Sequence, residues 1–186
     1  MAQQTRTGMF QALSNFQTVR DRAATLSQNL IRLRNESLQE SLSDFENSEH
    51  KLEFVKTIEG VDFINDSRAT NPNAVWFAME NITQPIIWIT NMNSVDLITE
   101  DLKQLIHEKV KIIVIQGVYN TALEDFLKKM HKDVYMVMNM EDAVRTAFYA
   151  GSSDETILFS PGVVSTGMYR TYRERGEKFK EAVAQL

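Results

Sequence analysis

The stretch 63–78, FINDSRATNPNAVWFA, places a polar loop between a short apolar strand and a helix that begins at Pro72. Asp66, Arg68 and Thr70 lie in this loop. Open α/β sheets hold their ligands and carry out their chemistry in loops at the carboxyl ends of strands. We therefore expect this loop to border a binding site.

Several motifs that would define a reaction do not occur in the sequence. It has no G-x-x-x-x-G-K-[ST] phosphate loop, no G-x-G-x-x-G dinucleotide fingerprint and no cysteine. The histidines, His50, His107 and His131, share no metal-ligand spacing, and we expect surface roles for the last two. Ser160 and Ser165 flank a Pro-Gly pair without the G-x-S-x-G elbow of a serine hydrolase. We therefore predict neither a catalytic residue nor a metal site.

The elements that must position the polar loop follow from the apolar pattern. From Lys51 onward, short apolar runs alternate with amphipathic segments, which is typical of βα units on a mainly parallel sheet. The expected strands are 52–58, 61–64, 86–90, 111–115, 134–137 and 156–159, and the expected helices are 72–81, 99–108, 121–130, 140–150 and 168–184. Only Glu59 and Gly60 separate the first two strands, so these strands should form a hairpin. The predicted fold is α/β, a Rossmann-like open sheet of about six strands, mostly parallel with one antiparallel strand.

An N-terminal helical extension over residues 1–45 should precede an α/β domain over residues 46–186. Between Gly8 and Gly60 there is neither Gly nor Pro, and apolar residues recur at helical spacing from Phe10 to Leu33. Asn35 would cap a second, shorter helix. The apolar stripe could pack on its own domain or pair with another subunit to form a homodimer.

Composition restricts the partners that we expect. The 186 residues, 43% of them hydrophobic, suffice for one good core. The absence of cysteine fits a reducing cytoplasm, and no apolar run is long enough for a signal peptide or a membrane span. A net charge of −5 gives no general attraction for nucleic acid. We interpret the basic residues near the C-terminus as a solvated helix rather than an anion site: Arg170, Arg173, Arg175, Lys178 and Lys180.

Three separated segments resemble the C-terminal domain of the Mur ligases, most of all the D-glutamate-adding members of that family. They are EHKLEFV at 49–55, FINDSRATNPNA at 63–74 and LFSPGVVSTGMYRTYRERGEKFKEAV at 158–183. The resemblance implies a Rossmann-like domain that brings the incoming amino acid in bacterial peptidoglycan synthesis. The family's UDP-muramoyl domain and P-loop ATPase domain are not matched. ATP and magnesium would therefore enter only in a complete ligase, and this chain alone would need no cofactor.

The same resemblance implies candidate binding residues. Those that would face a nucleotide are Lys51, Asp66 and Arg68. Those that would face the amino-acid substrate are Thr70, Ser165 and Tyr172. The family usually has arginine where this chain has Lys51, and lysine where it has Arg68; a lysine in place of arginine keeps the charge but loses the planar fork.

Two departures from the family pattern bear on the substrate. After its third strand the family has a Gly-Gly turn and then Asp-Lys-Gly, whose lysine pairs with the acidic substrate, whereas residues 90–95 here read TNMNSV. A carboxylate that loses its charged partner in a partly desolvated site loses roughly 2 to 3 kcal/mol, or about two orders of magnitude in affinity. An acidic residue that follows the family's serine is replaced by Gly167.

The retained residues also have structural explanations. Asp66 or Ser67 could cap the helix at Pro72, Ser165 could cap the last helix, and Tyr172 could simply pack. Their joint position at one sheet edge nevertheless favours a common pocket.

Two functions from different classes follow. The first is a stand-alone, non-catalytic module that binds a protein partner, a nucleotide or a peptide. The second is the amino-acid-binding portion of an ATP-dependent D-glutamate-adding ligase, cut from a longer protein or working with a separate ATPase chain. In such an enzyme ATP would convert a carboxylate to an acyl phosphate, which the amine of the amino acid attacks, and this domain would hold the amine donor.

Overall fold

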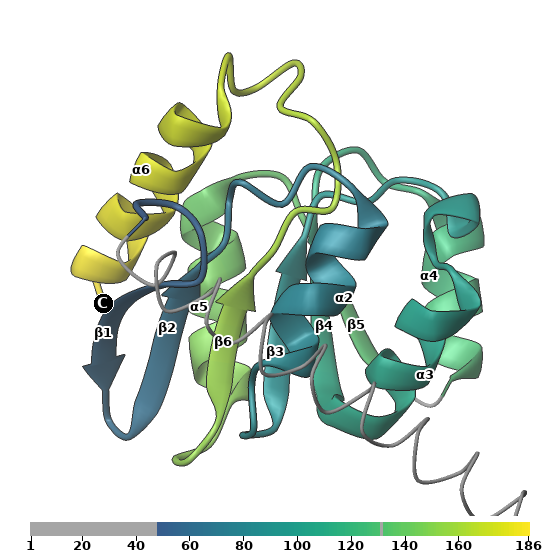
Figure 1. Ribbon diagram of the computed structural model, residues 1–186, viewed down its shortest axis with the longest axis horizontal. Coiled ribbons are helices and arrows are strands. Elements are labelled where there is room, and N and C mark those ends of the chain that lie inside the picture. The colour runs from purple at the N-terminus through teal and green to yellow at the C-terminus, as the bar shows by residue number, and fades with distance from the viewer. Residues whose placement is uncertain (1–47, 131) are drawn as a thin grey trace, which may run out of the picture. The chain divides into compact units, whose positions relative to one another are not determined.

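The computed structural model describes residues 48–130 and 132–186, which form one sheet with helices on both faces (Figure 1). The strands are β1 (Glu53–Ile58), β2 (Val61–Asn65), β3 (Ile86–Thr90), β4 (Val110–Gln116), β5 (Asp133–Val137) and β6 (Thr156–Phe159). Their order in the sheet is β1-β2-β6-β3-β4-β5. β1 and β2 pair antiparallel, and every other neighbouring pair is parallel. The predicted six-stranded α/β fold is confirmed.

The β1–β2 hairpin turns through two residues with positive φ, Glu59 at 51° and Gly60 at 82°. Positive φ at both positions gives a turn whose twist matches that of the flanking strands. Ile58 therefore faces Val61 across the turn, and the pairing continues to Glu53 opposite Asn65. The hairpin places β1 at one edge of the sheet, so that β2 can pair with β6.

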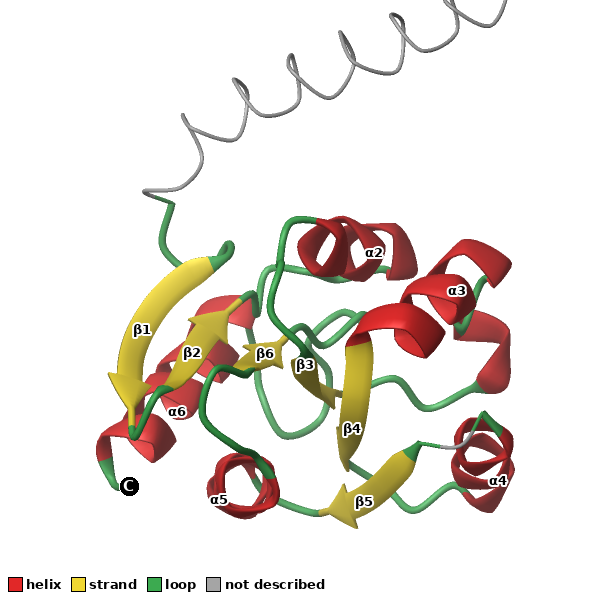
Figure 2. Cartoon of the chain, turned by 90° about the horizontal axis from the view of Figure 1, so that it is seen from below, coloured by secondary structure: helices red, strands yellow, loops and turns green. Residues whose placement is uncertain are grey.

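Two apolar cores lie on opposite faces of the sheet, beneath the helices that Figure 2 shows from below on either side. One face packs against α2 (Pro72–Glu80), α3 (Glu100–Lys109) and α4 (Thr121–Lys129). The other packs against α5 (Met140–Ala150) and α6 (Tyr172–Ala184), where Phe159 stacks on Phe179 with the ring centroids 5.0 Å apart. Because β3 and β6 are covered on both sides, all their residues are buried, and they read as continuous apolar runs.

Two helices, α2 and α6, have N-cap residues that differ from the predicted ones. Asn71 caps α2 by accepting from the Ala74 N–H at 3.0 Å, so the predicted caps Asp66 and Ser67 are wrong. The last helix begins at Tyr172 rather than at residue 168, with Thr171 as its cap in place of Ser165. A short 3₁₀ helix, Val95–Leu97, was not predicted.

The loops that follow the parallel strands meet at one edge of the sheet, the carboxyl edge, as the topology requires (Figure 1). The loop between β6 and α6, residues 160–171, rises above the others in this view. The predicted N-terminal helices and the boundary at residue 45 lie outside the described residues. In the described part of the chain, none of the helices has the length and apolar character that a membrane crossing requires.

Candidate functional site

Asp66 follows β2 directly and lies buried beneath the carboxyl edge. Its carboxyl group accepts from the Ser160 hydroxyl at 2.7 Å and from the Leu52 N–H at 3.3 Å. Burial raises the pKa of Asp66 to about 7, although these two bonds and the charge of Lys51 oppose the rise. Asp66 thus ties three segments together and is poised to change its protonation state near neutral pH.

Arg68 and Tyr172, which the sequence assigns to different ligands, meet at the surface. The guanidinium carbon of Arg68 lies 5.9 Å from the centre of the Tyr172 ring, and that of Arg173 lies 5.2 Å from it. His50 contacts the same ring edge-on, with the centroids 6.1 Å apart. Burial and the nearby charge of Arg68 lower the pKa of Lys51. Three of the predicted binding residues, Lys51, Arg68 and Tyr172, therefore lie in one region.

Arg175 is buried, with 2% of its surface exposed, so it is not part of the predicted solvated face, whereas Arg170, Arg173 and Lys178 are exposed as expected. Its Nη2 donates to the Ser67 carbonyl at 2.9 Å and to the Val163 carbonyl at 3.0 Å. Burial lowers the pKa of Arg175 to about 10. The side chain thereby joins the β2–α2 loop to the β6–α6 loop.

Gly176 allows α6 to approach this junction closely. A Cβ atom at this position would lie 2.3 Å from His50 Nδ1 and 2.4 Å from Ser67 Oγ, which is closer than side chains pack. Gly176 lies in the segment 158–183 that resembles the Mur ligases, but the sequence did not reveal its role at this junction. Glycine directly after an arginine, in a helix that must lie against a polar loop, was the available signal.

Four buried polar atoms at the carboxyl edge have no hydrogen-bond partner in the described part of the chain: Ser67 Oγ, Asn91 Oδ1, Ser165 Oγ and Arg175 Nε. Buried polar atoms without a partner are rare in folded proteins. A ligand or ordered water at this edge would satisfy them. Among the predicted substrate residues, Ser165 and Thr70 are both half-buried, and the Oγ atom of Ser165 is inaccessible and without a partner.

A chain of neutral side chains lies where the family lysine is expected. Asn91 Nδ2 donates to the backbone oxygen of Gln116 at 2.8 Å and to its Oε1 at 2.9 Å. Gln116 Nε2 is in turn bonded to the Tyr169 hydroxyl at 2.7 Å. These contacts connect the ends of β3 and β4 to the β6–α6 loop without any cation. The segment 90–95 itself contains no basic residue.

Charged residues beside β1 form a cluster in which the spacing of the ligand atoms would allow a metal ion to bind. Ligand atoms of Glu49, His50 and Glu177 lie within 4.8 Å of one another. Lys180 Nζ, however, lies 2.8 Å from Glu177, 2.9 Å from Glu49 and 3.4 Å from Glu53. Burial opposes the positive charge of Lys180, but its bonds with Glu177 and Glu49 raise its pKa. The ammonium group supplies the positive charge that these carboxylates require, so we interpret the cluster as an ion-pair network.

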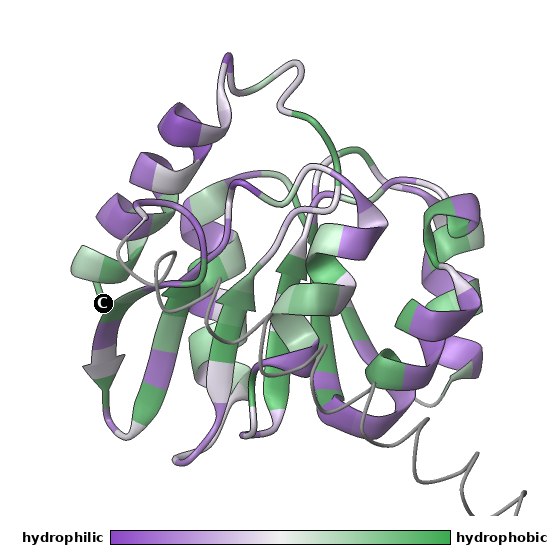
Figure 3. Cartoon of the chain, in the orientation of Figure 1, coloured by the Kyte–Doolittle hydropathy of each residue, from purple (hydrophilic) through white to green (hydrophobic). Residues whose placement is uncertain are grey.

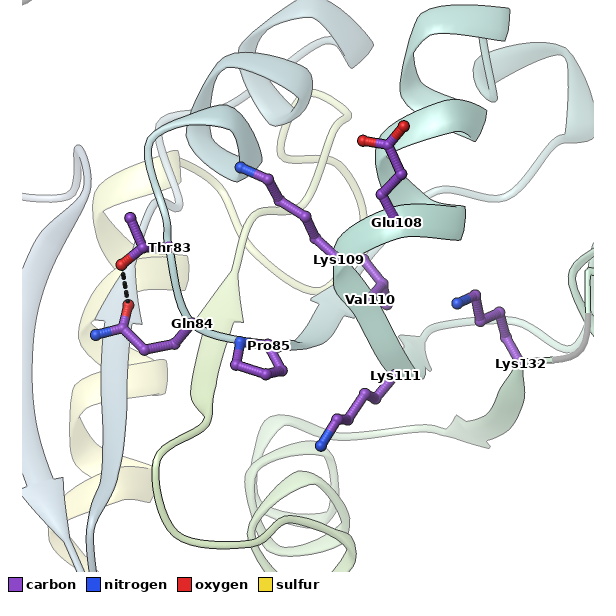
Figure 4. A pocket seen from close by; sticks show the side chains of 8 residues that line it. All are labelled: Thr83, Gln84, Pro85, Glu108, Lys109, Val110, Lys111 and Lys132. Atoms are coloured by element: carbon purple, nitrogen blue, oxygen red, sulfur yellow. Dashed lines mark hydrogen bonds between the residues drawn. The ribbon is translucent and has the colours of Figure 1, made fainter.

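A hollow of about 450 Å³ lies at the opposite, amino edge of the sheet (Figure 4). Three lysines line it, and each is engaged. Lys109 Nζ donates to the carbonyls of the last turn of α2 and the residues after it, at Met79, Glu80 and Ile82, all at 2.9 to 3.1 Å. Lys132 Nζ donates to the His107 carbonyl at 3.1 Å, and Lys111 is paired with Glu155. Lys109 and Lys132 thus stabilise the C-termini of α2 and α3, and Lys111 is neutralised by Glu155, so all three lysines have structural roles.

Comparison with known proteins relates this geometry to a family, although no family model matches the chain. The UDP-N-acetylmuramoylalanine–D-glutamate ligase of Bacteroides fragilis is 36% identical over 165 residues, which cover 88% of this chain and 37% of that protein. The Salinibacter ruber protein of the same name is 37% identical over 164 residues, with 88% of this chain and 36% of the relative covered.

Among solved structures, the UDP-N-acetylmuramate–alanine ligase of Thermotoga maritima matches with a TM-score of 0.52 and 15% identity, over 78% of this chain and 32% of that one. At this identity the match supports the fold alone. The chain spans little more than a third of the length of the curated relatives it matches. Their similarity nevertheless extends over most of this chain, which is a domain like the C-terminal one of the Mur ligases.

Proposed function

We propose that this chain is a binding module of bacterial peptidoglycan precursor synthesis that does not carry out ligation by itself. The relatives' names supply the pathway, because they are ligases that add D-glutamate to a UDP-muramoyl precursor. The observation that carries the non-catalytic proposal is the neutral Asn91–Gln116–Tyr169 chain at the carboxyl edge.

An acidic amino acid needs a positive partner to bind tightly in a partly desolvated site. The amide nitrogen of Asn91 is already bonded to Gln116, and Nη2 of Arg175 donates to two backbone carbonyls, which leaves the Nε of Arg175 without a partner. Loss of one charged partner weakens binding by about two orders of magnitude. D-glutamate should therefore bind this domain weakly.

Calorimetric titration with D-glutamate, with L-glutamate as the stereochemical control, tests this proposal. We expect a Kd for D-glutamate above about 1 mM and no preference over L-glutamate. Sub-millimolar, stereospecific binding would contradict the proposal. Titration with ADP addresses the nucleotide-facing roles of Lys51, Asp66 and Arg68, which stay predictions; an Arg68→Ala variant should bind ADP more weakly if Arg68 contacts phosphate.

A second function is favoured by the unpartnered Ser67 and Ser165 hydroxyls, which suit a bound amino acid. In this case the domain would hold D-glutamate while a separate ATP-binding domain activates the muramoyl substrate. Mixing this chain with the remaining two domains of the Bacteroides fragilis relative, ATP, magnesium, UDP-N-acetylmuramoylalanine and D-glutamate distinguishes the two functions. D-glutamate-dependent ADP release that requires this chain would establish the second function; its absence supports the first.

A further inference from the structure

The guanidinium groups of three arginines, Arg170 and Arg173 at the start of α6 and Arg68 in the β2–α2 loop, form no ion pair in the described part of the chain. The guanidinium groups of Arg68 and Arg173 both lie over the Tyr172 ring, and Arg170 precedes the helix. No Asp or Glu carboxylate within residues 48–130 and 132–186 forms an ion pair with any of the three. By contrast, the lysines of the same helix are paired, Lys178 with Glu181 and Lys180 with Glu177. The charges of Arg68, Arg170 and Arg173 are therefore not neutralised by an ion pair within the described residues.

Large apolar side chains are exposed on the adjoining β6–α6 loop. Val164 is 60% exposed and Met168 is 52% exposed. Figure 1 shows this loop standing clear of the sheet edge, and Figure 3 shows hydrophobic residues along the limb that leaves β6. Exposed apolar residues in the loop that leads into the arginine-bearing start of α6 suit a partner that offers both carboxylates and apolar side chains.

We propose that Arg68, Arg173, Val164 and Met168 form a docking surface for an acidic peptide segment of a partner protein. Carboxylates of the segment would bind the two guanidinium groups, which are well suited to bidentate contact. Apolar side chains of the segment would cover Val164 and Met168, removing them from water. A free phosphate would satisfy the arginines alone and leave the apolar residues exposed, so the combined surface favours a peptide.

This inference deepens the proposed binding-module function by naming the chemistry of its partner. The two can fail separately. Peptide binding is tested through Arg173 and Val164, whereas the D-glutamate titration depends on the carboxyl-edge residues below the loop. Weak binding of D-glutamate together with no peptide binding would leave the first proposal standing and remove the second.

The test uses fluorescence anisotropy with a fluorescein-labelled peptide of about twelve residues that alternates glutamate with leucine. One control peptide has glutamine in place of glutamate, and another has serine in place of leucine. We expect the acidic, apolar peptide to bind and both control peptides to bind at least about tenfold more weakly. Failure of the acidic, apolar peptide to bind at millimolar concentration overturns the proposal.

Protein variants locate the surface. Arg173→Glu and Val164→Ser should each weaken binding, the former by about tenfold or more, whereas Arg145→Glu on the exposed face of α5 should change it less than about twofold. Equal losses for Arg145→Glu and Arg173→Glu would show that binding depends only on general electrostatics, and this would contradict the proposal.

Other ligands are distinguished by competition. If inorganic phosphate displaces the peptide and Val164→Ser binds the peptide as tightly as the natural chain does, the surface is an anion site and the proposal is overturned. Tighter binding of single-stranded poly(U) than of the peptide would indicate a nucleic-acid surface instead. Circular dichroism melting checks that every variant is folded.

Discussion

Asp66 keeps a carboxyl group inside the protein with one hydroxyl and one backbone N–H as partners. Its pKa rises from an ordinary 3.8 to about 7 because burial penalises the charged form. The folded state thus binds this proton more tightly than the unfolded state. The stabilising contribution is complete below about pH 4 and is lost as the pH rises to about 7, with a total on the order of 4 kcal/mol.

The variant Asp66→Asn should remove this pH dependence, because an amide keeps the polar contacts and cannot ionise. Urea unfolding at about pH 5 and about pH 8 measures the effect. We expect the stability of the variant relative to the natural chain to rise by roughly 1 to 4 kcal/mol between these two values. Parallel stability curves for the two proteins would show that Asp66 does not titrate in this range.

Gly176 provides a second prediction for a single residue. A methyl group there would clash with His50 and Ser67. We expect Gly176→Ala to cost roughly 1 to 3 kcal/mol, although alanine is the better helix former, because the buried junction cannot open freely. Glu181→Ala, at an exposed position of the same helix, should change stability by less than about 0.5 kcal/mol in the same urea experiment. Equal stabilities for Gly176→Ala and the natural chain would show that the loop yields to the added atom.

The limits of sequence reasoning are clear at single residues. The polar loop after β2 could be predicted because its residues are adjacent in the chain. The burial of Asp66 could not, because its partner Ser160 lies 94 residues away. Arg175 was misinterpreted for the same reason, since its acceptors Ser67 and Val163 belong to two different loops.

The side chain of Arg175 links the β2–α2 loop to the β6–α6 loop. Arg175→Met would retain an unbranched side chain but leave the Ser67 and Val163 carbonyls without their donor. We expect a loss of roughly 2 kcal/mol and faster amide hydrogen exchange in residues 163–170. Arg175→Lys keeps the charge and should give a smaller loss, because one ammonium can still reach a carbonyl. Unchanged exchange in Arg175→Met would mean that this side chain does not hold the β6–α6 loop.

Strand and helix positions were predictable because their apolar periodicity is local. β3, β6 and α5 begin and end at the predicted residues, and most other boundaries differ by one residue. The start of α6 was wrong by four residues because several hydroxyl residues in this loop could serve as caps. Thr171 accepts from the Glu174 N–H at 3.1 Å while Glu174 accepts from the Arg170 N–H at 2.8 Å, and this reciprocal pair favours Thr171 over Ser165.

For the molecule as a whole, parallel strand pairing was enough to predict that the polar loops meet at one edge. The sequence did not predict which of these loops would contain polar atoms without a hydrogen-bond partner, because that depends on how closely α6 packs against them. The unpartnered atoms and the unpaired arginines now divide this edge into a buried polar part and an exposed cationic part. The two parts call for different ligands, and this is why the amino-acid and peptide proposals are tested with different variants.

The predicted apolar stripe between Phe10 and Leu33 bears on assembly, and we propose from the sequence that it mediates a homodimer. Sedimentation equilibrium should then give about twice the chain mass of 21.4 kDa for the natural protein and a monomer for a variant lacking residues 1–33. Leu26→Asp with Leu30→Asp should also yield a monomer, because two charges enter the stripe. Thr25→Asp with Gln28→Asp adds the same charge off the stripe and should leave the dimer intact. If the stripe variant keeps the mass of the natural chain, the stripe packs elsewhere, and any self-association must come from the α/β domain.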